Sequence, residues 1–228
     1  MTADTQKQAA GEAAARLIEP GMTIGLGTGS TAVHFVRALA ARNLADIRGV
    51  PTSEATAALA RELGIPLVDL NDARAIDITV DGADEIGPGL ALIKGAGGAL
   101  LREKLVWEAS ARCIVIAEAA KRVAVLGRFP LSIEVVAFGH VTTLRRIAMG
   151  LADAGVATIP HLRLQDGEPV YTDNGNLLYA APCGAILDPP AVEAALKSIT
   201  GVVDHGLFLG LAERALIGTD DGVVTLKA

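Results

Sequence analysis

The stretch MTIGLGTGSTAVHFVRALAARN, residues 22–43, contains the three parts of a βα unit in order. Its first five residues are an apolar run typical of a buried strand, and its last thirteen carry apolar side chains at helical spacing. Between them lies a glycine-rich turn. A strand, a short loop and a helix in this order predict the first unit of a parallel α/β sheet.

The same alternation continues along the first two-thirds of the chain, with helical patterns such as SEATAALARELG between apolar runs. Apolar strands that alternate with helices predict a parallel sheet covered on both faces. We expect residues 1–127 together with 206–228 to form this Rossmann-like domain. The predicted strands are residues 22–26, 47–50, 65–70, 76–80, 90–93 and 113–117.

A different pattern begins near residue 126. A strand is followed by a helix, two strands, a second helix and a last strand, which is the order of a small α+β, ferredoxin-like domain. We expect it to span residues 128–205, with helices near 141–154 and 190–199 and strands near 156–164 and 176–187. The tail from Leu207 reads as a strand pair around a turn at 220–222 that returns to the first domain.

Composition places the chain among compact globular proteins, with 51% hydrophobic and 20% charged residues. The net charge of −6, without a block of like charge, argues against a nucleic-acid surface. The N-terminus has no apolar core for a signal peptide, and no run approaches the roughly 18 apolar residues of a membrane span. We therefore expect a cytoplasmic protein in which Cys113 and Cys183 are buried free thiols.

The glycine-rich turn GLGTGSTA, residues 25–32, lacks the lysine of a P-loop. It matches the dinucleotide pattern G-x-G-x-x-A, but Pro51 stands where such a site needs an acid at the end of the second strand. Thr28, Ser30 and Thr31 supply hydroxyls at a helix N-terminus, which suits a single phosphate group. An ordinary Ser/Thr-capped helix explains the same residues.

The second loop, DGADEI (residues 81–86), directly follows a predicted strand. Because ligands of parallel sheets bind beyond the carboxyl ends of the strands, Asp81 and Asp84 are candidate ligand-binding residues. A solvated acidic turn or a site for a hard cation remains open as an alternative, although the spacing of the acids is wrong for a calcium loop.

The third loop, KGAGGALLREK (residues 94–104), joins Lys94 to a flexible oxyanion-type loop and then to a predicted helix. Glu103 lies on the apolar stripe of that helix, between Leu100 and Trp107. Desolvation there favours the neutral form and raises the pKa of Glu103, which suits a general base near neutral pH. The alternatives are a tertiary salt bridge and an exposed helix edge.

All three loops follow predicted parallel strands, so we expect them to converge on one crevice. Their side chains offer proton transfer on a small, phosphorylated and hydroxylated molecule. The sequence shows neither a metal-ligand cluster nor a nucleophile–histidine arrangement, so we expect no metal and no cofactor. The four histidines are scattered along the chain: His34, His140, His161 and His205.

These three motifs, in this order and spacing, closely resemble the type A ribose-5-phosphate isomerases. The similarity covers nearly the whole chain and includes PTSEAT (51–56), LGRFPLSIEVVAF (126–138), TDNGN (172–176) and GVVDHGLF (201–208). The resemblance implies a cofactor-free and metal-free isomerase of the non-oxidative pentose phosphate pathway. Such an enzyme interconverts ribose 5-phosphate and ribulose 5-phosphate, and it is usually a homodimer or homotetramer.

Position by position, Glu103 matches the catalytic base of the family, which carries a proton between C2 and C1 through an enediolate. We assign Asp81 to the hydroxyl proton in ring opening and Lys94 to the charge on the reacting oxygens. The chain departs from the family in having Glu118-Ala119-Ala120 before its lysine, and Ala180 after TDNGN. The resemblance places these residues around the substrate: Lys7, Thr28, Gly29, Ser30, Thr31, Asp81, Gly82, Ala83, Asp84, Lys94, Gly95, Ala96, Gly97 and Lys121.

Two other classes of protein share parts of this pattern. A sugar-phosphate-sensing domain of a transcriptional regulator would need a DNA-binding helix pair and a basic face, but the N-terminus offers one helix. An acyl-CoA transferase with a glutamate nucleophile would need a longer chain and a CoA site. The sequence therefore favours the isomerase over both alternatives.

Overall fold

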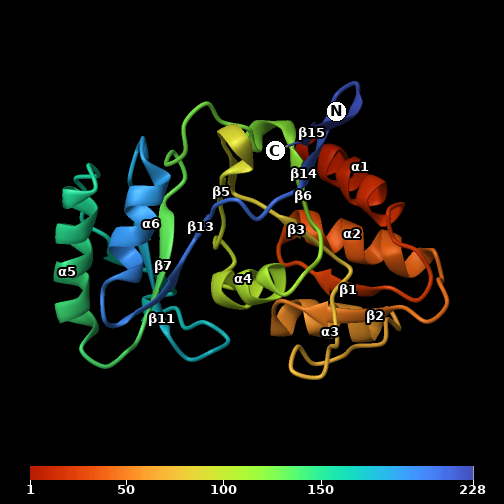
Figure 1. The fold of residues 1–228 in the computed structure, drawn as a ribbon, viewed down its shortest axis with the longest axis horizontal. Coiled ribbons are helices and arrows are strands. Elements are labelled where there is room, and N and C mark those ends of the chain that lie inside the picture. The colour runs from red at the N-terminus through yellow and green to blue at the C-terminus, as the bar shows by residue number, and fades with distance from the viewer. Residues whose placement is uncertain (228) are drawn as a thin grey trace. The chain divides into compact units, whose positions relative to one another are not determined.

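The computed structural model describes residues 1–227, which divide into two compact units (Figure 1). The first unit contains residues 1–83, 102–121 and those from 210 onward; the second contains residues 84–101 and 122–209. The sequence placed residues 84–101 with the first domain. The structure gives them to the second unit, because the two short strands within them pair with a strand at 207–208.

The first unit is built on a six-stranded sheet in which only the last strand, β15, is antiparallel to its neighbour. The predicted strand pair at the C-terminal end is confirmed: β14 and β15 form a hairpin that joins the sheet beside β6. In spatial order the strands are β15 (Gly222–Lys227), β14 (Arg214–Thr219), β6 (Cys113–Glu118), β3 (Ile78–Gly82), β1 (Thr23–Leu26) and β2 (Arg48–Pro51).

Two predicted parallel strands are wrong. Residues 65–70 make only one bridge, from Leu67 to Gly49, because Pro66 has no N–H to extend a ladder. Of residues 90–93, only β5 (Leu92–Ile93) is a strand, and it belongs to an antiparallel sheet of the second unit. The third loop therefore does not follow a strand of the parallel sheet.

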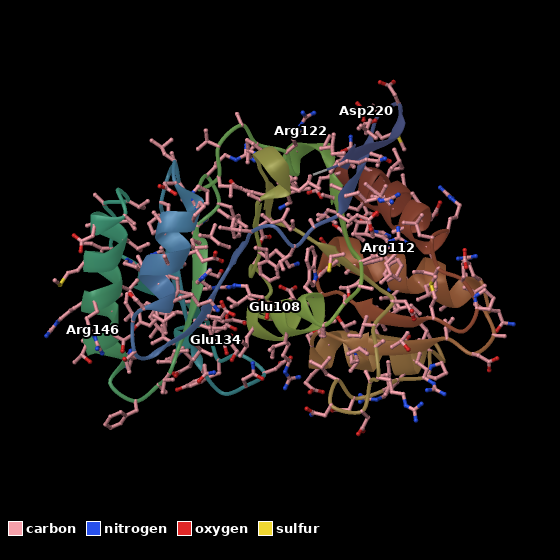
Figure 2. The ribbon with its side chains drawn as sticks, viewed as in Figure 1. Glu108, Arg112, Arg122, Glu134, Arg146 and Asp220 are labelled. Carbon is pink, nitrogen blue, oxygen red and sulfur yellow. The ribbon has the colours of Figure 1, made fainter. Side chains whose placement is uncertain are left out.

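An ion pair joins the starts of β6 and β14. Arg112, labelled in Figure 2, donates from Nε to Glu213 Oε2 at 2.8 Å. Hydrogen bonds from Arg112 and Arg214 lower the pKa of Glu213 to about 2. Both side chains are more than a third exposed, so solvent screens the pair and its main effect is to fix strand register.

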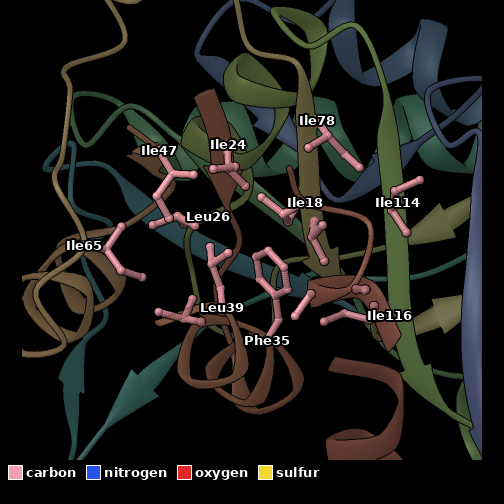
Figure 3. Close-up of a cluster of buried hydrophobic side chains, with 14 of the residues drawn as sticks. Ile18, Ile24, Leu26, Phe35, Leu39, Ile47, Ile65, Ile78, Ile114 and Ile116 are labelled. Atoms are coloured by element: carbon pink, nitrogen blue, oxygen red, sulfur yellow. The ribbon is translucent and has the colours of Figure 1, made fainter. Parts of the chain in front are cut away.

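The core of the first unit lies between the sheet and its helices (Figure 3). Ile24, Ile78 and Ile114, on three adjacent strands, pack with Phe35 from the second helix. Gly11 lets the first two helices approach, since a Cβ there would lie 2.7 Å from the Phe35 nitrogen. The helices of this unit are α1 (Ala3–Ala15), α2 (Ser30–Ala41), α3 (Glu54–Glu62), α4 (Leu100–Glu108) from Arg102 onward, and the 3₁₀ turn η2 (Ala119–Lys121).

The second unit contains a four-stranded antiparallel sheet in the order β12-β7-β11-β8, with helices α5 and α6 packed on it. Strand, helix, strand, strand, helix, strand in this order is the ferredoxin-like arrangement that the sequence predicted. Its elements are η1 (Pro88–Leu90), β4 (Glu85–Ile86), β7 (Leu131–Val135), α5 (His140–Asp153), β8 (His161–Leu162), β9 (Leu164–Gln165), β10 (Glu168–Pro169), β11 (Leu177–Ala181), α6 (Pro189–Lys197), β12 (Val202–His205) and β13 (Leu207–Phe208).

Helix length also bears on membranes. The longest helix, α5, has 14 residues. Within residues 1–227 no helix combines the length and the apolar character that a bilayer crossing requires.

Replacing Gly218 by Ala tests how tightly α1 covers the sheet. A Cβ on this β14 residue would collide with the carbonyl oxygen of Gln6 in α1, and backbone cannot yield as a side chain can. We expect a loss of about 1–3 kcal/mol or more in unfolding free energy, measured by urea denaturation.

Gly150→Ala is the matched control for Gly218→Ala. Its Cβ would meet the flexible end of Ile199 at 3.2 Å and the Ala195 Cβ at an ordinary contact distance of 3.8 Å, and alanine gains about 1 kcal/mol in helix propensity. We expect the control to be neutral or stabilising. Equal stability of the two variants would contradict the close packing of α1 on β14.

Candidate active site

Asp81, at the carboxyl end of β3, fixes the glycine-rich loop between β1 and α2. Its Oδ1 accepts hydrogen bonds from the N–H groups of Thr28, at 3.0 Å, and Gly82, at 2.7 Å. Asp81 is 0% exposed, and Gly27 makes room for it, since a Cβ on Gly27 would collide with the carboxylate. The sequence predicted that Asp81 lies beside this loop, but not that its carboxylate holds the loop in place.

The N-terminus of α2 opens onto the same loop. Its N-cap is Gly29, with φ 105°, and no side-chain hydrogen bond caps the helix. The alternative of an ordinary Ser/Thr-capped helix is therefore wrong. The first N–H groups and the positive end of the helix dipole remain available to an anion, next to the exposed side chain of Ser30 and the buried Thr31.

A lysine from α1 reaches this helix start. Lys7 Nζ donates to Ser30 Oγ at 3.0 Å, across 23 residues of sequence. The sequence placed Lys7 here by resemblance alone. A cation, a hydroxyl and a helix N-terminus together suit a phosphate group.

The hydroxyl of Thr28 is directed inward. It lies 2.7 Å from Thr52 Oγ1, 2.8 Å from Ser53 Oγ and 3.1 Å from Thr56 Oγ1. Thr52 and Thr56 in turn donate to carbonyl oxygens at the end of β1 and in the loop. The three hydroxyls of PTSEAT thus support the loop from beneath, a role that the sequence analysis missed.

Glu103 lies in α4 and is only 4% exposed. Leu100 and Trp107, one turn before and after it, are also buried, as the apolar stripe predicted. The exposed-edge alternative is wrong for Glu103. Burial removes water from around the carboxylate, which is the condition that a desolvated general base requires.

Lys121 is half-buried in η2, directly after β6. The turn is tied to α1, because the N–H of Ala119 donates to Gln6 Oε1 at 3.2 Å. Gln6 immediately precedes Lys7. The chain segments that carry Lys7 and Lys121 are therefore in contact, although Glu118-Ala119-Ala120 differs from the family pattern.

In the second unit, Asp84 and the KGAGG loop form one hydrogen-bonded group. Asp84 Oδ2 accepts from the N–H of Ala96 at 2.9 Å. Lys94 is 2% exposed, and its Nζ lies 5.5 Å from the centre of the Phe208 ring, within cation–π range. A buried lysine beside a glycine-rich loop can offer positive charge and backbone N–H donors to anionic oxygens.

Arg163 is a residue of this group that the sequence analysis missed. It donates from Nη1 to the carbonyl of Gly95 at 3.1 Å and from Nη2 to that of Ala96 at 2.7 Å. Burial lowers the pKa of Arg163, and the charge of Asp84 opposes that shift. No local pattern could have found it, since its partners are backbone oxygens far back in the sequence.

The TDNGN segment is held by Glu134 of β7, labelled in Figure 2. Glu134 Oε1 accepts from Thr172 Oγ1 and from Asn176 Nδ2, both at 2.9 Å. The motif therefore fastens a turn to the four-stranded sheet.

The histidines and acids of residues 1–227 include no group of three or more that could hold a metal ion. Three of the histidines have hydrogen-bonding partners, and His205 Nδ1 accepts from the N–H of Leu207 at 3.2 Å. His34 Nε2 lies 3.0 Å from Asp4 Oδ1, and His140 Nδ1 lies 2.7 Å from the Tyr179 hydroxyl.

The parallel sheet, the ferredoxin-like unit and the buried acid and lysine side chains are those of an α/β enzyme. The family model described as ribose 5-phosphate isomerase A (phosphoriboisomerase A) matches residues 48–222. The chain belongs to this family, and it is an isomerase.

Relatives and solved structures of this family match the chain over 99–100% of its length. Ribose-5-phosphate isomerase A of Caulobacter vibrioides (strain NA1000 / CB15N) is 66% identical over 227 residues, covering 100% of both chains. That of Parvibaculum lavamentivorans is 54% identical over 232 residues, again covering 100% of both. The structure of ribose 5-phosphate isomerase from Plasmodium falciparum superposes with a TM-score of 0.93, at 37% identity and 99% coverage of each chain. A D-ribose-5-phosphate isomerase in complex with phospho-erythronic acid gives 0.92, at 37% identity and 100% coverage of each.

Both cysteines are free thiols, as expected, but only Cys113 is fully buried. Burial raises the pKa of Cys113 to about 12, with the charge of Asp81 adding to the shift. Burial also raises the pKa of the half-buried Cys183, to about 11. A thiol whose pKa lies far above the ambient pH stays protonated and is a poor nucleophile.

The native protein should therefore resist iodoacetamide at pH 8. Both thiols are protonated at that pH, and Cys113 is shielded as well. After urea denaturation both should be alkylated, which intact-mass spectrometry would show as two added groups. Rapid alkylation of Cys113 in the folded protein would contradict the burial described above.

Proposed function

We propose that this chain interconverts ribose 5-phosphate and ribulose 5-phosphate by proton transfer, with Glu103 as the general base. Family membership supports the substrate, and the burial of the Glu103 carboxylate on α4 is the observation that carries the mechanism. The non-oxidative pentose phosphate pathway follows from this activity.

The reaction begins with ring opening, in which we assign Asp81 to the movement of the hydroxyl proton. Glu103 then removes the proton from C2 of the open aldose, and the electron pair moves to make an enediolate. The same carboxyl group returns its proton to C1, and the proton of the C2 hydroxyl passes to the C1 oxygen, so that C2 becomes the ketone carbon. One base serves both directions, so no group outside the chain is required for the proton transfer.

The substrate phosphate is assigned to the start of α2, where Lys7 contacts Ser30. Thr28, Gly29 and Thr31 complete that loop, and the bond from the Thr28 N–H to Asp81 holds it in place. We extend the substrate-binding role to the remaining predicted residues. These are Gly82, Ala83, Asp84, Lys94, Gly95, Ala96, Gly97 and Lys121.

We further propose that the protein acts in the cytoplasm as a homodimer or homotetramer. The family resemblance supports self-association, and the second unit exposes several large apolar side chains that association would cover. Phe138 is 93% exposed, Leu187 85% and Ile159 79%. Light scattering after gel filtration would give the number of subunits.

Glu103→Gln keeps the side chain's size but removes the base. We expect ribose 5-phosphate to bind while kcat falls by at least about 10²-fold, the lower end of a general base's contribution. Coupled detection of ribulose 5-phosphate would measure the rate.

Glu108→Gln is the matched control, because Glu108 lies on the same helix at the exposed surface (Figure 2). We expect it to keep wild-type turnover. Near-normal kcat in the Glu103 variant would remove that residue from the mechanism.

Replacing Ser30 and Thr31 together by Ala should raise KM for ribose 5-phosphate more than it lowers kcat. The phosphate is remote from the reacting carbons, so its contacts stabilise substrate and transition state alike. Steady-state kinetics of the double variant would separate the two constants.

Thr142→Ala is the control for this double variant. It removes an exposed hydroxyl from the first turn of another helix, α5, where the side chain bonds only to Gly139 O. A fall in kcat alone for the Ser30, Thr31 variant would place the phosphate elsewhere.

A further inference from the structure

The KGAGG loop contains a tight β-turn. The N–H of Gly98 donates to the carbonyl of Gly95 at 3.0 Å, so Ala96 and Gly97 are the two central residues. Gly95, with φ 108°, adopts a backbone conformation that favours glycine. The Gly95 carbonyl also accepts from Ser132 Oγ at 3.1 Å, so the entry of the turn is well fixed.

The middle peptide of a β-turn, here between Ala96 and Gly97, is its least constrained part. Rotating that peptide reverses its C=O and N–H and converts a type I turn into type II, which needs a positive φ at the second central residue. Gly97 does not have a positive φ here, but a glycine can adopt one at little cost. The turn sequence alone therefore does not decide which way this peptide faces.

Arg163 decides it. Its Nη2 donates to the Ala96 carbonyl, the middle peptide's own oxygen, at 2.7 Å, while Nη1 takes the Gly95 carbonyl. Because a trans peptide is planar, each N–H points opposite to its C=O. The Ala96 N–H accordingly faces away from Arg163 and bonds to Asp84 Oδ2. The Gly97 N–H is turned away from Arg163 in the same manner, on an exposed residue of the loop.

We propose that Arg163 is a positioning residue, which locks the Ala96–Gly97 peptide so that the Gly97 N–H is a ready donor to an oxygen of the substrate. This inference rests on the proposed isomerase function, in which negative charge develops on the sugar oxygens. A donor fixed before the reaction stabilises that charge without reorganisation.

The chemistry of arginine suits this role better than that of lysine. Two nitrogens of one planar guanidinium bind two successive carbonyl oxygens, a geometry that a single ammonium cannot reproduce. Half-burial of the side chain strengthens both hydrogen bonds.

Arg163→Ala should lower kcat by about 10- to 100-fold and change KM for ribose 5-phosphate less. The expected loss is below the roughly 10²–10³-fold effect of deleting an oxyanion donor, because the freed turn still visits the active orientation. The kcat of Arg163→Lys should lie between those of Arg163→Ala and the wild type. The lysine variant tests the proposal if the alanine variant does not fold.

Two control variants separate positioning from general effects. Ser132→Ala removes a side-chain bond to Gly95 but leaves the middle peptide held by Arg163. Arg146→Ala removes one positive charge from the surface of α5 in the same unit (Figure 2). We expect both to stay within about 3-fold of wild-type kcat, since one hydrogen bond or exposed charge contributes little.

Binding supplies a readout that lost stability would not mimic. Phospho-erythronic acid carries a carboxylate whose two oxygens resemble those of the enediolate. Titration calorimetry should show that Arg163→Ala weakens the binding of phospho-erythronic acid by a factor similar to the loss in kcat. The affinity for inorganic phosphate should stay unchanged. Equal losses in Ser132→Ala and Arg163→Ala, or a change in KM alone, would overturn the proposal.

The result also distinguishes this inference from the proposed function. If the wild type does not turn over ribose 5-phosphate, the function itself fails. If the wild type is active and depends on Glu103, but Arg163→Ala behaves like Arg146→Ala, only the positioning role fails.

Discussion

The hydrogen bonds of the Asp81 carboxylate are the constraint on which the first unit's candidate site depends. Its Oδ1 accepts hydrogen bonds from the N–H groups of Thr28 and Gly82, which lie at the ends of two adjacent parallel strands. Gly27 is required because any Cβ would occupy the space of that carboxylate. With the loop fixed, Gly29 is the N-cap of α2, and Ser30, the first residue of the helix, bonds to Lys7. An internal acceptor thus determines where an external anion can bind.

Elements with long apolar runs or sustained helical spacing could be predicted from sequence. The strands β1, β3 and β6 and the helix α2 lie where their patterns placed them. The failures at 65–70 and 90–93 share one feature: a short apolar run is compatible with a strand, but it does not decide whether or with what that strand pairs. Pro66 prevents a ladder in the first, and in the second Leu92 and Ile93 pair with β13, far along the chain.

Candidate site residues could be predicted where the signal was local. Glu103 stood out because a carboxylate interrupted an apolar stripe, and its burial followed. The contact of Lys7 with Ser30 and the role of Arg163 could not be derived this way. Their partners lie many residues away, and in the case of Arg163 they are backbone oxygens that have no sequence signature. The inward direction of the Thr28 hydroxyl depends in the same way on β2 and α3.

The buried acids also explain how a chain of net charge −6 can offer sites for an anion. Asp81 fastens the loop before α2, Glu85 accepts from the N–H groups of Gly127 and Phe129 at 2.7 and 2.6 Å, and Glu134 holds TDNGN. Charge-assisted bonds of this kind are roughly twice as strong as neutral ones, so each acid fixes a loop that lacks regular structure. Their charges are offset by inward-facing donors. The loop that Asp81 fixes thus presents free N–H groups at the start of α2, and the overall charge of the protein has little influence on an anion at that short range.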